Sequence, residues 1–292
     1  MFHVRRIDSH VHFWRYDADD YPWMSADMDA IKRDRMPADA RTLFDQKQID
    51  ACVAVQARMR EDETDFLLGL AQTRPWIAAV IGWVDLTDEQ LPERLERWRA
   101  ARQLKGFRHI LQNDAAAGSL VAGDDFRRGV RTLQAGTLIY ELLISADQLP
   151  LVTDFCRAMD RHWLVLDHLG KPDIRNRRFD EWLRDVTPLA RLPHVACKLS
   201  GIVTEANDAQ GACDESHIQR YLDSALELFG ARRLMFGSDW PVCSLVASYA
   251  ATTQIIERWS AKLSAEERDW IFGNAAAQIY GIAGLATERK SP

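Results

Sequence analysis

Short hydrophobic runs recur along the chain between longer segments that have helical spacing. The runs are predicted to be strands, and they cover residues 5–12, 51–57, 77–84, 104–111, 137–144, 163–169, 195–200 and 233–239. The intervening segments place apolar residues three or four positions apart, as at Leu91, Leu95 and Trp98, which predicts amphipathic helices. The strand runs are almost continuously hydrophobic, as is typical of parallel strands buried on both faces. Eight strand–helix units predict an α/β fold, a (β/α)8 TIM barrel, in preference to an open doubly wound sheet.

Two segments fall outside this alternation. Residues 13–39 form an unusually long connection that is rich in aromatic residues, and long loops of this kind are often functional lids. Residues 266–280 predict an extra C-terminal helix that packs outside the barrel and has no chemical role. No linker or low-complexity tract interrupts the pattern, so residues 1–292 are predicted to form a single domain.

Composition excludes several classes of partner. The formal net charge of −6 argues against nucleic-acid binding, and no apolar run is long enough to span a membrane. The five cysteines include no Cys-x-x-Cys pair, and Cys52 and Cys197 lie inside apolar strand runs as small core residues. A reducing, cytoplasmic location is therefore expected. The chain is expected to act as a monomer or homodimer on a small molecule.

The strongest chemical signal is a pair of histidines at the end of the first predicted strand. His10 and His12 are two residues apart, so their rings share one face of the strand. Taken alone, such a pair can be two hydrogen-bonded core histidines. The last predicted strand, however, ends in Asp239, and the carboxyl ends of all strands meet at one end of a barrel. The two features together predict a catalytic site there.

Polar residues stand near the carboxyl end of every predicted strand. In strand order they are His10 and His12, Gln56, Trp83 and Asp85, Arg108 and His109, Tyr140 and Glu141, Asp167, His168 and Lys171, Lys198 and Ser200, and Asp239 with Trp240. Buried charges need partners or a wet pocket, and the mouth of a barrel provides such a pocket. A shift of one residue would exchange the faces of Arg108 with His109 and of Tyr140 with Glu141, so both alternatives stay open for these pairs.

Three segments carry a resemblance to a known family. Asp-Ser-His-Val-His at 8–12, Leu-Asp-His-Leu-Gly at 166–170 and Phe-Gly-Ser-Asp-Trp-Pro at 236–241 resemble the amidohydrolase superfamily, in its branch of sugar and pyrone lactonases similar to L-fuconolactonase. The resemblance runs almost end to end and implies a (β/α)8 barrel that hydrolyses a bond at a carbonyl carbon.

The chain departs from the metal-rich members of that superfamily. Those members have a lysine or acid on strand four and a histidine on strand five, where this chain has Arg108-His109 and Tyr140-Glu141. A dinuclear site is therefore not expected. His10, His12 and Asp239 can hold a single Zn²⁺ or Mn²⁺, because three such ligands and a water make a catalytic site. Some lactonases of this branch are thought to work without metal, and we expect that no cofactor is required.

These residues lead to a hypothesis of lactone hydrolysis by general-base catalysis. Asp239 is predicted to take a proton from the attacking water, while His10, His12 and His168 stabilise the oxyanion. Arg108 and Lys198 are predicted to bind the substrate. Trp14 and Trp83 would contact its ring, and Gln56, His109 and Tyr140 would bind its hydroxyl groups.

The predicted substrate is a neutral aldonolactone, such as L-fucono- or L-rhamnono-lactone. A dicarboxylate would need several converging guanidinium groups, and Arg108 is the clearest candidate at the strand ends. A lactonase acting on a pyrone dicarboxylate and a metal-dependent decarboxylase of the same superfamily remain alternatives. A catalytically silent barrel that binds a sugar acid is a third alternative.

Overall fold

A computed structural model describes residues 6–206 and 215–282 of the chain. Eight strands form one sheet in the order in which they occur in the sequence, and every neighbouring pair is parallel. They are β1 (Ile7–Val11), β2 (Ala51–Val55), β3 (Ile77–Gly82), β4 (Leu104–Ile110), β5 (Ile139–Leu143), β6 (Leu164–Leu166), β7 (Val195–Leu199) and β8 (Leu234–Phe236). An isolated bridge between Val11 and Trp240 brings the last strand back to the first. The predicted (β/α)8 barrel is confirmed.

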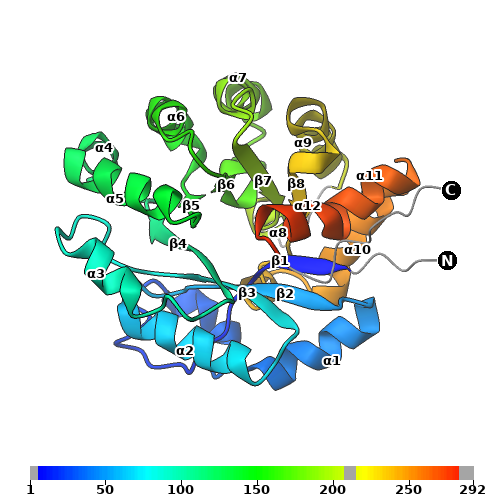
Figure 1. Ribbon diagram of the computed structural model, residues 1–292. Helices are drawn as coiled ribbons and strands as arrows, with labels where there is room; N and C mark the ends of the chain where they lie inside the picture. Colours follow the sequence, from blue (N-terminus) through cyan, green and yellow to red (C-terminus); the bar gives the residue numbers. More distant parts are fainter. Residues whose placement is uncertain (1–5, 207–214, 283–292) are drawn as a thin grey trace, which may run out of the picture.

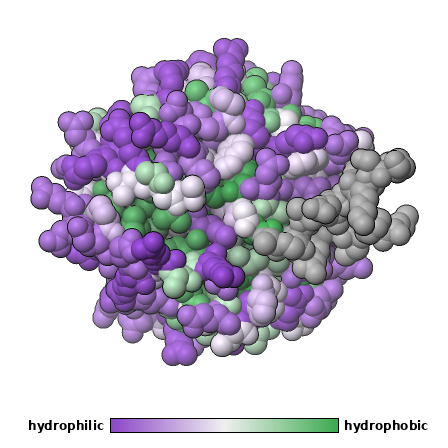
Figure 2. All heavy atoms as spheres, in the orientation of Figure 1, coloured by the Kyte–Doolittle hydropathy of each residue, from purple (hydrophilic) through white to green (hydrophobic). Residues whose placement is uncertain are grey.

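Helices surround the ring of strands (Figure 1). They are α1 (Pro37–Lys47), α2 (Glu61–Gln72), α3 (Leu91–Glu96), α4 (Ala117–Ala122), α5 (Asp124–Ala135), α6 (Leu149–Ala158), α7 (Phe179–Ala190), α8 (Ile202–Ala206), α9 (Glu215–Phe229), α10 (Tyr249–Ser260), α11 (Ala265–Asp269) and α12 (Ala275–Ile279). Figure 2 shows hydrophilic side chains around the periphery of one face, with hydrophobic ones gathered toward its middle. Within the described ranges, no helix combines the length and apolar character needed to cross a membrane.

The alternation of side chains along the strands builds two cores. One lies between the strands and the surrounding helices and contains most of the large apolar residues, among them Phe107, Phe126 and Phe155. The other fills the inside of the barrel with smaller residues such as Val53, Ala79 and Val165. Cys52, Cys156, Cys197 and Cys243 are buried and unpaired, and Cys213 lies outside the described residues. Cys52 and Cys197 are core residues, as predicted.

The C-terminal segment closes one end of the barrel. The single helix expected at 266–280 is split into α11 and α12 by a wider turn over Trp270–Asn274. Residues of α12, followed by Tyr280, pack against the inner core near the amino ends of the strands. Figure 1 shows α12 beside β1 and β8. The Tyr280 hydroxyl donates to Glu141 Oε1 at 2.5 Å, so this segment also holds a side chain inside the barrel.

The long connection after β1 forms a small core of its own. Trp14, Tyr21, Met24 and Ile31 are buried together with Ala57, which follows β2. The Trp14 indole N–H donates to the carbonyl of Arg33 at 2.9 Å. The aromatic residues of this segment therefore fold it against the barrel, and its expected role as a lid stays a prediction.

We predict that Tyr280→Phe destabilises the protein. The substitution leaves Glu141 Oε1 buried without its donor, and such a loss costs about 1–3 kcal/mol of the free energy of unfolding. Tyr221→Phe is the matched control, because the buried Tyr221 hydroxyl has no protein partner. Its free energy of unfolding should stay at the wild-type value or rise slightly. Denaturant titration of both variants measures the difference, and equal stabilities would contradict the assigned role of Tyr280.

Candidate active site

His10 and His12 face each other at the carboxyl end of β1. The pairing of β1 with β2 shifts in register between Asp8 and Val11, so both Ile7 and His10 lie on the inner side of the barrel. The two Nε2 atoms are 3.2 Å apart, and His10 is fully buried. The predicted shared face for the two rings is confirmed.

Asp239 approaches the two histidines from the turn after β8. Its backbone is in the left-handed region, with φ of 60°, a conformation found at functional sites more than elsewhere. The Asp239 N–H donates to the His10 carbonyl at 2.9 Å, and the His12 N–H donates to the Trp240 carbonyl at 2.7 Å. Asp239 Oδ1 consequently lies 3.4 Å from His12 Nε2 and 3.8 Å from His10 Nε2.

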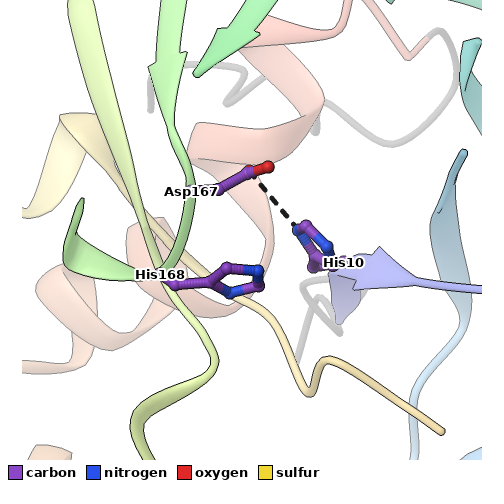
Figure 3. Close-up of side chains that lie close together, drawn as sticks. All are labelled: His10, Asp167 and His168. Carbon is purple, nitrogen blue, oxygen red and sulfur yellow. Dashed lines mark ion pairs between the residues drawn. The ribbon is translucent and has the colours of Figure 1, made fainter. Parts of the chain in front are cut away.

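The Nδ1 atoms of both histidines have partners within the barrel, and that of His10 lies 3.2 Å from Lys198 Nζ. His12 Nδ1 lies 2.8 Å from the Val55 carbonyl, so Nδ1 carries the proton and Nε2 keeps a free lone pair. His10 Nδ1 lies 3.4 Å from Asp167 Oδ1, the ion pair drawn in Figure 3. Acceptors of this kind are what orient histidines that bind metals. His12 Nε2 faces the space shared with Asp239, and His10 Nε2 lies beside it, 3.3 Å from Arg108 Nη1 as well.

The three side chains fit a single divalent ion. Zinc–ligand bonds of about 2.0–2.1 Å in tetrahedral geometry place neighbouring ligand atoms roughly 3.3 Å apart. The separations between His10 Nε2, His12 Nε2 and Asp239 Oδ1 are 3.2, 3.4 and 3.8 Å. Two imidazole nitrogens and one carboxylate oxygen are a ligand set typical of catalytic zinc, with a position left for water.

A second cluster around His10 is unsuited to a cation. His10, Asp167 and His168 lie close together (Figure 3). Asp167 Oδ1 is 3.1 Å from Lys198 Nζ, and Asp167 Oδ2 accepts from Arg108 Nη1 at 2.9 Å. Two fixed cations therefore already compensate this carboxylate, and they would repel a metal ion there. This arrangement supports the expectation of one ion and not two.

A buried ionic network surrounds Asp167. Lys198 Nζ donates to Glu141 Oε2 at 2.6 Å, and Glu141 also accepts from Tyr280. Burial raises the pKa of Glu141 to about 7, against the attraction of Lys198. Burial acts in the same direction on Asp167, but Lys198, His10 and Arg108 together outweigh it and hold the pKa of Asp167 well below its ordinary value. Asp167 is thus the permanent anion of the network.

Three titratable groups at the site, His10, His168 and Asp239, have displaced pKa values. Burial, followed by the repulsion of Lys198, keeps the pKa of His10 well below its ordinary value, and burial lowers the pKa of His168 to about 4. Burial alone would raise the pKa of Asp239, but the imidazoles of His168, His12 and His10 outweigh it and lower that pKa. Neutral imidazoles and an ionised carboxylate are the states in which these groups bind a metal.

His168 is placed by an unusual turn. The strand predicted over 163–169 ends at Leu166, because His168, Leu169, Gly170 and Lys171 all have left-handed backbone conformations. This turn brings His168 Nδ1 to 2.8 Å from Ser200 Oγ and its ring centroid to 4.4 Å from that of His10. A Cβ at Gly201 would lie 2.8 Å from the His168 ring, so only glycine leaves room for this imidazole.

The structure decides the two alternatives left open by the strand patterns. Arg108 faces inward to Asp167, whereas the His109 ring lies near Trp83 and Phe126, with centroids 6.4 and 5.8 Å away. Glu141 likewise faces inward to Lys198. Tyr140 faces outward and packs edge-on against Phe126 and Phe155. The prediction that Tyr140 binds a substrate hydroxyl is wrong, because its side chain lies in the core between strands and helices.

Three further residues that were predicted to contact the substrate are too deeply buried to do so. Trp14 is inaccessible to solvent within the small core of residues 13–39, so it cannot touch a ligand in this conformation. Lys198 is equally enclosed, with its ammonium on Glu141 and Asp167. Gln56 is buried and donates to the Arg108 carbonyl at 3.0 Å, and therefore ties the carboxyl end of β2 to β4. These residues support the site from behind.

Three of the predicted substrate-binding residues are not fully enclosed. Trp83 and His109 are half-buried, and Arg108 is 3% exposed, with its guanidinium held by Asp167 and the Gln56 carbonyl. Sequence reasoning gave no site role to Glu141, Asp167 or Tyr280. Glu141 and Asp167 stand among the strand-end residues, but nothing in the sequence connects Tyr280 with a strand 139 positions away.

We predict that Tyr140→Phe leaves catalysis unchanged. The hydroxyl of Tyr140 has no protein partner and lies outside the barrel, so its removal takes nothing from the site. Steady-state kinetics on the substrate proposed below should give wild-type kcat and KM. A rise in KM of tenfold or more would mean that the hydroxyl reaches the substrate and would contradict this placement.

Comparison with known proteins agrees with this geometry. Residues 7–282 match the amidohydrolase family. An L-fucono-1,5-lactonase from Burkholderia multivorans is 49% identical and aligns over 97% of this chain and 98% of its own. A second L-fucono-1,5-lactonase, from Burkholderia ambifaria, is 32% identical over 95% of this chain and 96% of its own.

Solved structures lead to the same family. A crystal structure of an amidohydrolase from Burkholderia multivorans with bound zinc has a TM-score of 0.93 and 49% identity, and it covers 95% of this chain and 99% of that one. A 2-pyrone-4,6-dicarboxylic acid hydrolase homologue from Pseudomonas putida, with 22% identity and a TM-score of 0.78, shares the fold. The resemblance to the lactonase branch expected from the sequence is confirmed. The chain belongs to the amidohydrolase family.

Proposed function

We propose that this protein is a sugar lactonase that hydrolyses L-fucono-1,5-lactone or a closely related aldonolactone. The observation that carries the proposal is the facing set of His10, His12 and Asp239, in a chain 49% identical end to end to a protein named for that activity. Water adds to the lactone carbonyl carbon, the bond from that carbon to the ring oxygen breaks, and the product is the open-chain hydroxy acid.

We infer that one divalent ion is held by His10 Nε2, His12 Nε2 and Asp239 Oδ1. The distances between these atoms support it, as does the bound zinc of a similar structure. This inference replaces the expectation that no cofactor is required. A bound ion in this position supplies Lewis-acid polarisation of a carbonyl and lowers the pKa of a bound water.

Asp239 and His168 have the positions needed for proton transfer and for oxyanion stabilisation. The described side-chain contacts of Asp239 involve Oδ1, so Oδ2 is available to take the proton of the attacking water and to return it to the ring oxygen. Ser200 Oγ donates to His168 Nδ1 in our assignment, which leaves the proton on Nε2 as a donor to the carbonyl oxygen. The role of Asp239 and the role of His168 each require a single proton to move only a short distance.

The charges around the mouth favour a neutral substrate. Arg108 is bound to Asp167 and to the Gln56 carbonyl, and Arg58 forms ion pairs with Asp20 and Glu63. Neither guanidinium is left free to pair with a carboxylate of a pyrone dicarboxylate. Trp83 and His109 offer a half-buried indole and imidazole at one side of the mouth, and we assign the sugar ring to that side.

We predict that Asp239→Asn lowers kcat by 10²–10⁴-fold, on the order expected for loss of a general base. The assay follows acid release from L-fucono-1,5-lactone with a pH indicator. Asp223→Asn is the control, since Asp223 on α9 binds Trp259 on α10 and Lys262 just after it, on the outside of the barrel. Its activity should equal that of the wild type, and an equally active Asp239→Asn variant would contradict the assignment.

We also predict that chelation removes the activity and that Zn²⁺ or Mn²⁺ restores it. The ion would be bound by three of the side chains that would carry the reaction. Its removal would therefore leave these side chains misplaced for the substrate. The same indicator assay measures activity before chelation, after it and after metal is added back. Full activity in chelated, metal-free protein would contradict the proposed ion. Carbon dioxide release from an aromatic acid, with no lactone turnover, would support a decarboxylase instead.

A further inference from the structure

The proposed site spans the one junction of the barrel that lacks a regular ladder in the described residues. Here β8 and β1 are joined by the bridge between Val11 and Trp240 and by backbone hydrogen bonds of residues 10, 12, 239 and 240. We call this junction the seam, and define it as residues 8–12 together with 236–240. His10 and His12 stand on one side of the seam and Asp239 on the other. The distances between their ligand atoms therefore depend on how the two sides are held together.

A single buried side chain ties both sides of the seam. Asp8 Oδ1 accepts from the His10 N–H at 3.2 Å and from the Ser238 N–H at 2.8 Å. Asp8 Oδ2 accepts from the Tyr249 hydroxyl at 3.1 Å. Asp8 is fully buried, and Tyr249 belongs to α10 on the outside of the barrel. One carboxylate thus holds the backbone at His10, the backbone next to Asp239 and the covering helix.

The Asp8 carboxylate replaces backbone hydrogen bonds that a regular ladder between β8 and β1 would provide. The register of β1 shifts between Asp8 and Val11, and the His10 amide within that shift bonds to the Asp8 side chain. A buried amide without an acceptor would cost free energy, so the carboxylate both satisfies it and fixes the local backbone. Packing leaves little room for adjustment, because a Cβ at Gly237 would lie 2.9 Å from His10 Cβ and 3.0 Å from Ser200 Cβ.

We propose that Asp8 is a positioning residue of the active site, with Tyr249 as its anchor. It sets the spacing between the histidine pair and Asp239 through the backbone, and its contacts are with backbone amides, the Ser238 side chain and Tyr249 and not with the reacting groups. Metal affinity and catalysis both respond to sub-ångström changes in such spacing. The effect of Asp8 on turnover rests on the proposed function, whereas its effect on metal affinity does not.

The test compares Asp8→Ala with Asp8→Asn. The alanine variant removes every tie, while the amide oxygen of asparagine can still accept from both backbone amides and its NH2 can donate to Tyr249. Zinc affinity is measured by calorimetric titration of metal-free protein, and kcat and KM are measured on L-fucono-1,5-lactone. For Asp8→Ala we expect zinc affinity and kcat to fall by about 10–100-fold, as when groups that orient metal ligands are removed. Asp8→Asn should restore both to within a few-fold of the wild type.

Gln134→Ala is the matched control for loss of stability alone. Gln134 is buried on α5 and donates to the carbonyls of Met159 and His162 at 2.8 and 3.0 Å, near the amino end of β6 and away from the site. This variant should lose thermal stability and keep wild-type zinc affinity and kcat. An equal loss of zinc affinity in Gln134→Ala would overturn the proposal, because the effect would then follow stability and not position.

Tyr249→Phe keeps the proposal testable should Asp8→Ala fail to fold. This variant removes the contact with Oδ2 and leaves both backbone ties, so zinc affinity should fall by a few-fold at unchanged circular dichroism. Wild-type affinity in Tyr249→Phe, or a loss in Asp8→Asn as large as that in Asp8→Ala, would overturn the proposal. Absence of lactone turnover in the wild type would refute the proposed function, while the zinc titrations would still decide the role of Asp8.

Discussion

The Asp167 carboxylate lies fully buried with Arg108 Nη1 at 2.9 Å, Lys198 Nζ at 3.1 Å and His10 Nδ1 at 3.4 Å. Charges removed from water in this way stabilise a fold only when each has its partners, and loss of one partner leaves the others uncompensated. Glu141 is the second acid of the network and accepts from Lys198, although burial raises its pKa to about 7. The balanced network fills the barrel directly beneath the histidines and fixes the ring of His10. Every feature of the site above it depends on that orientation.

This network and the reacting groups lie at different depths inside the barrel. Toward the amino ends of the strands, Tyr280 closes the network by donating to Glu141. Toward the carboxyl ends, His10, His12 and Asp239 present two imidazole nitrogens and a carboxylate oxygen to one small space. Lys198 and Arg108 compensate the Asp167 carboxylate and make the inner cluster unfavourable for a metal. A chain that has Arg108 and Lys198 in place of further metal ligands can thus keep one ion in a defined position.

The fold could be predicted well from the sequence because the repeating hydrophobic pattern is a direct consequence of strand burial. Buried parallel strands must be apolar throughout, and the eight runs were found within a few residues of the observed strands. The proximity of His10, His12 and Asp239 could also be predicted, since strand ends of a barrel converge. Tyr140 could not be distinguished from Glu141, because the face of a strand residue depends on a register that no local pattern records.

The other features that the sequence did not predict correctly have causes outside the strand pattern. Trp14 and Lys198 have the chemistry of binding residues, but Trp14 is buried in the small core of its own segment and Lys198 by its ion pairs inside the barrel. The end of β6 at Leu166 comes from four successive left-handed residues, of which only Gly170 is a residue that favours that conformation. Asp8 acts through backbone amides across the seam, and a motif reveals only that an acid precedes the histidines.

The central claim is that one divalent ion binds between His10, His12 and Asp239. Crystals grown with Zn²⁺ and measured at the zinc absorption edge test it most directly, because anomalous scattering locates the ion independently of activity. We predict one peak per chain, within bonding distance of the two Nε2 atoms and of Asp239 Oδ1. A peak between His10, Asp167 and His168, or two peaks at the mouth of the barrel, would contradict it.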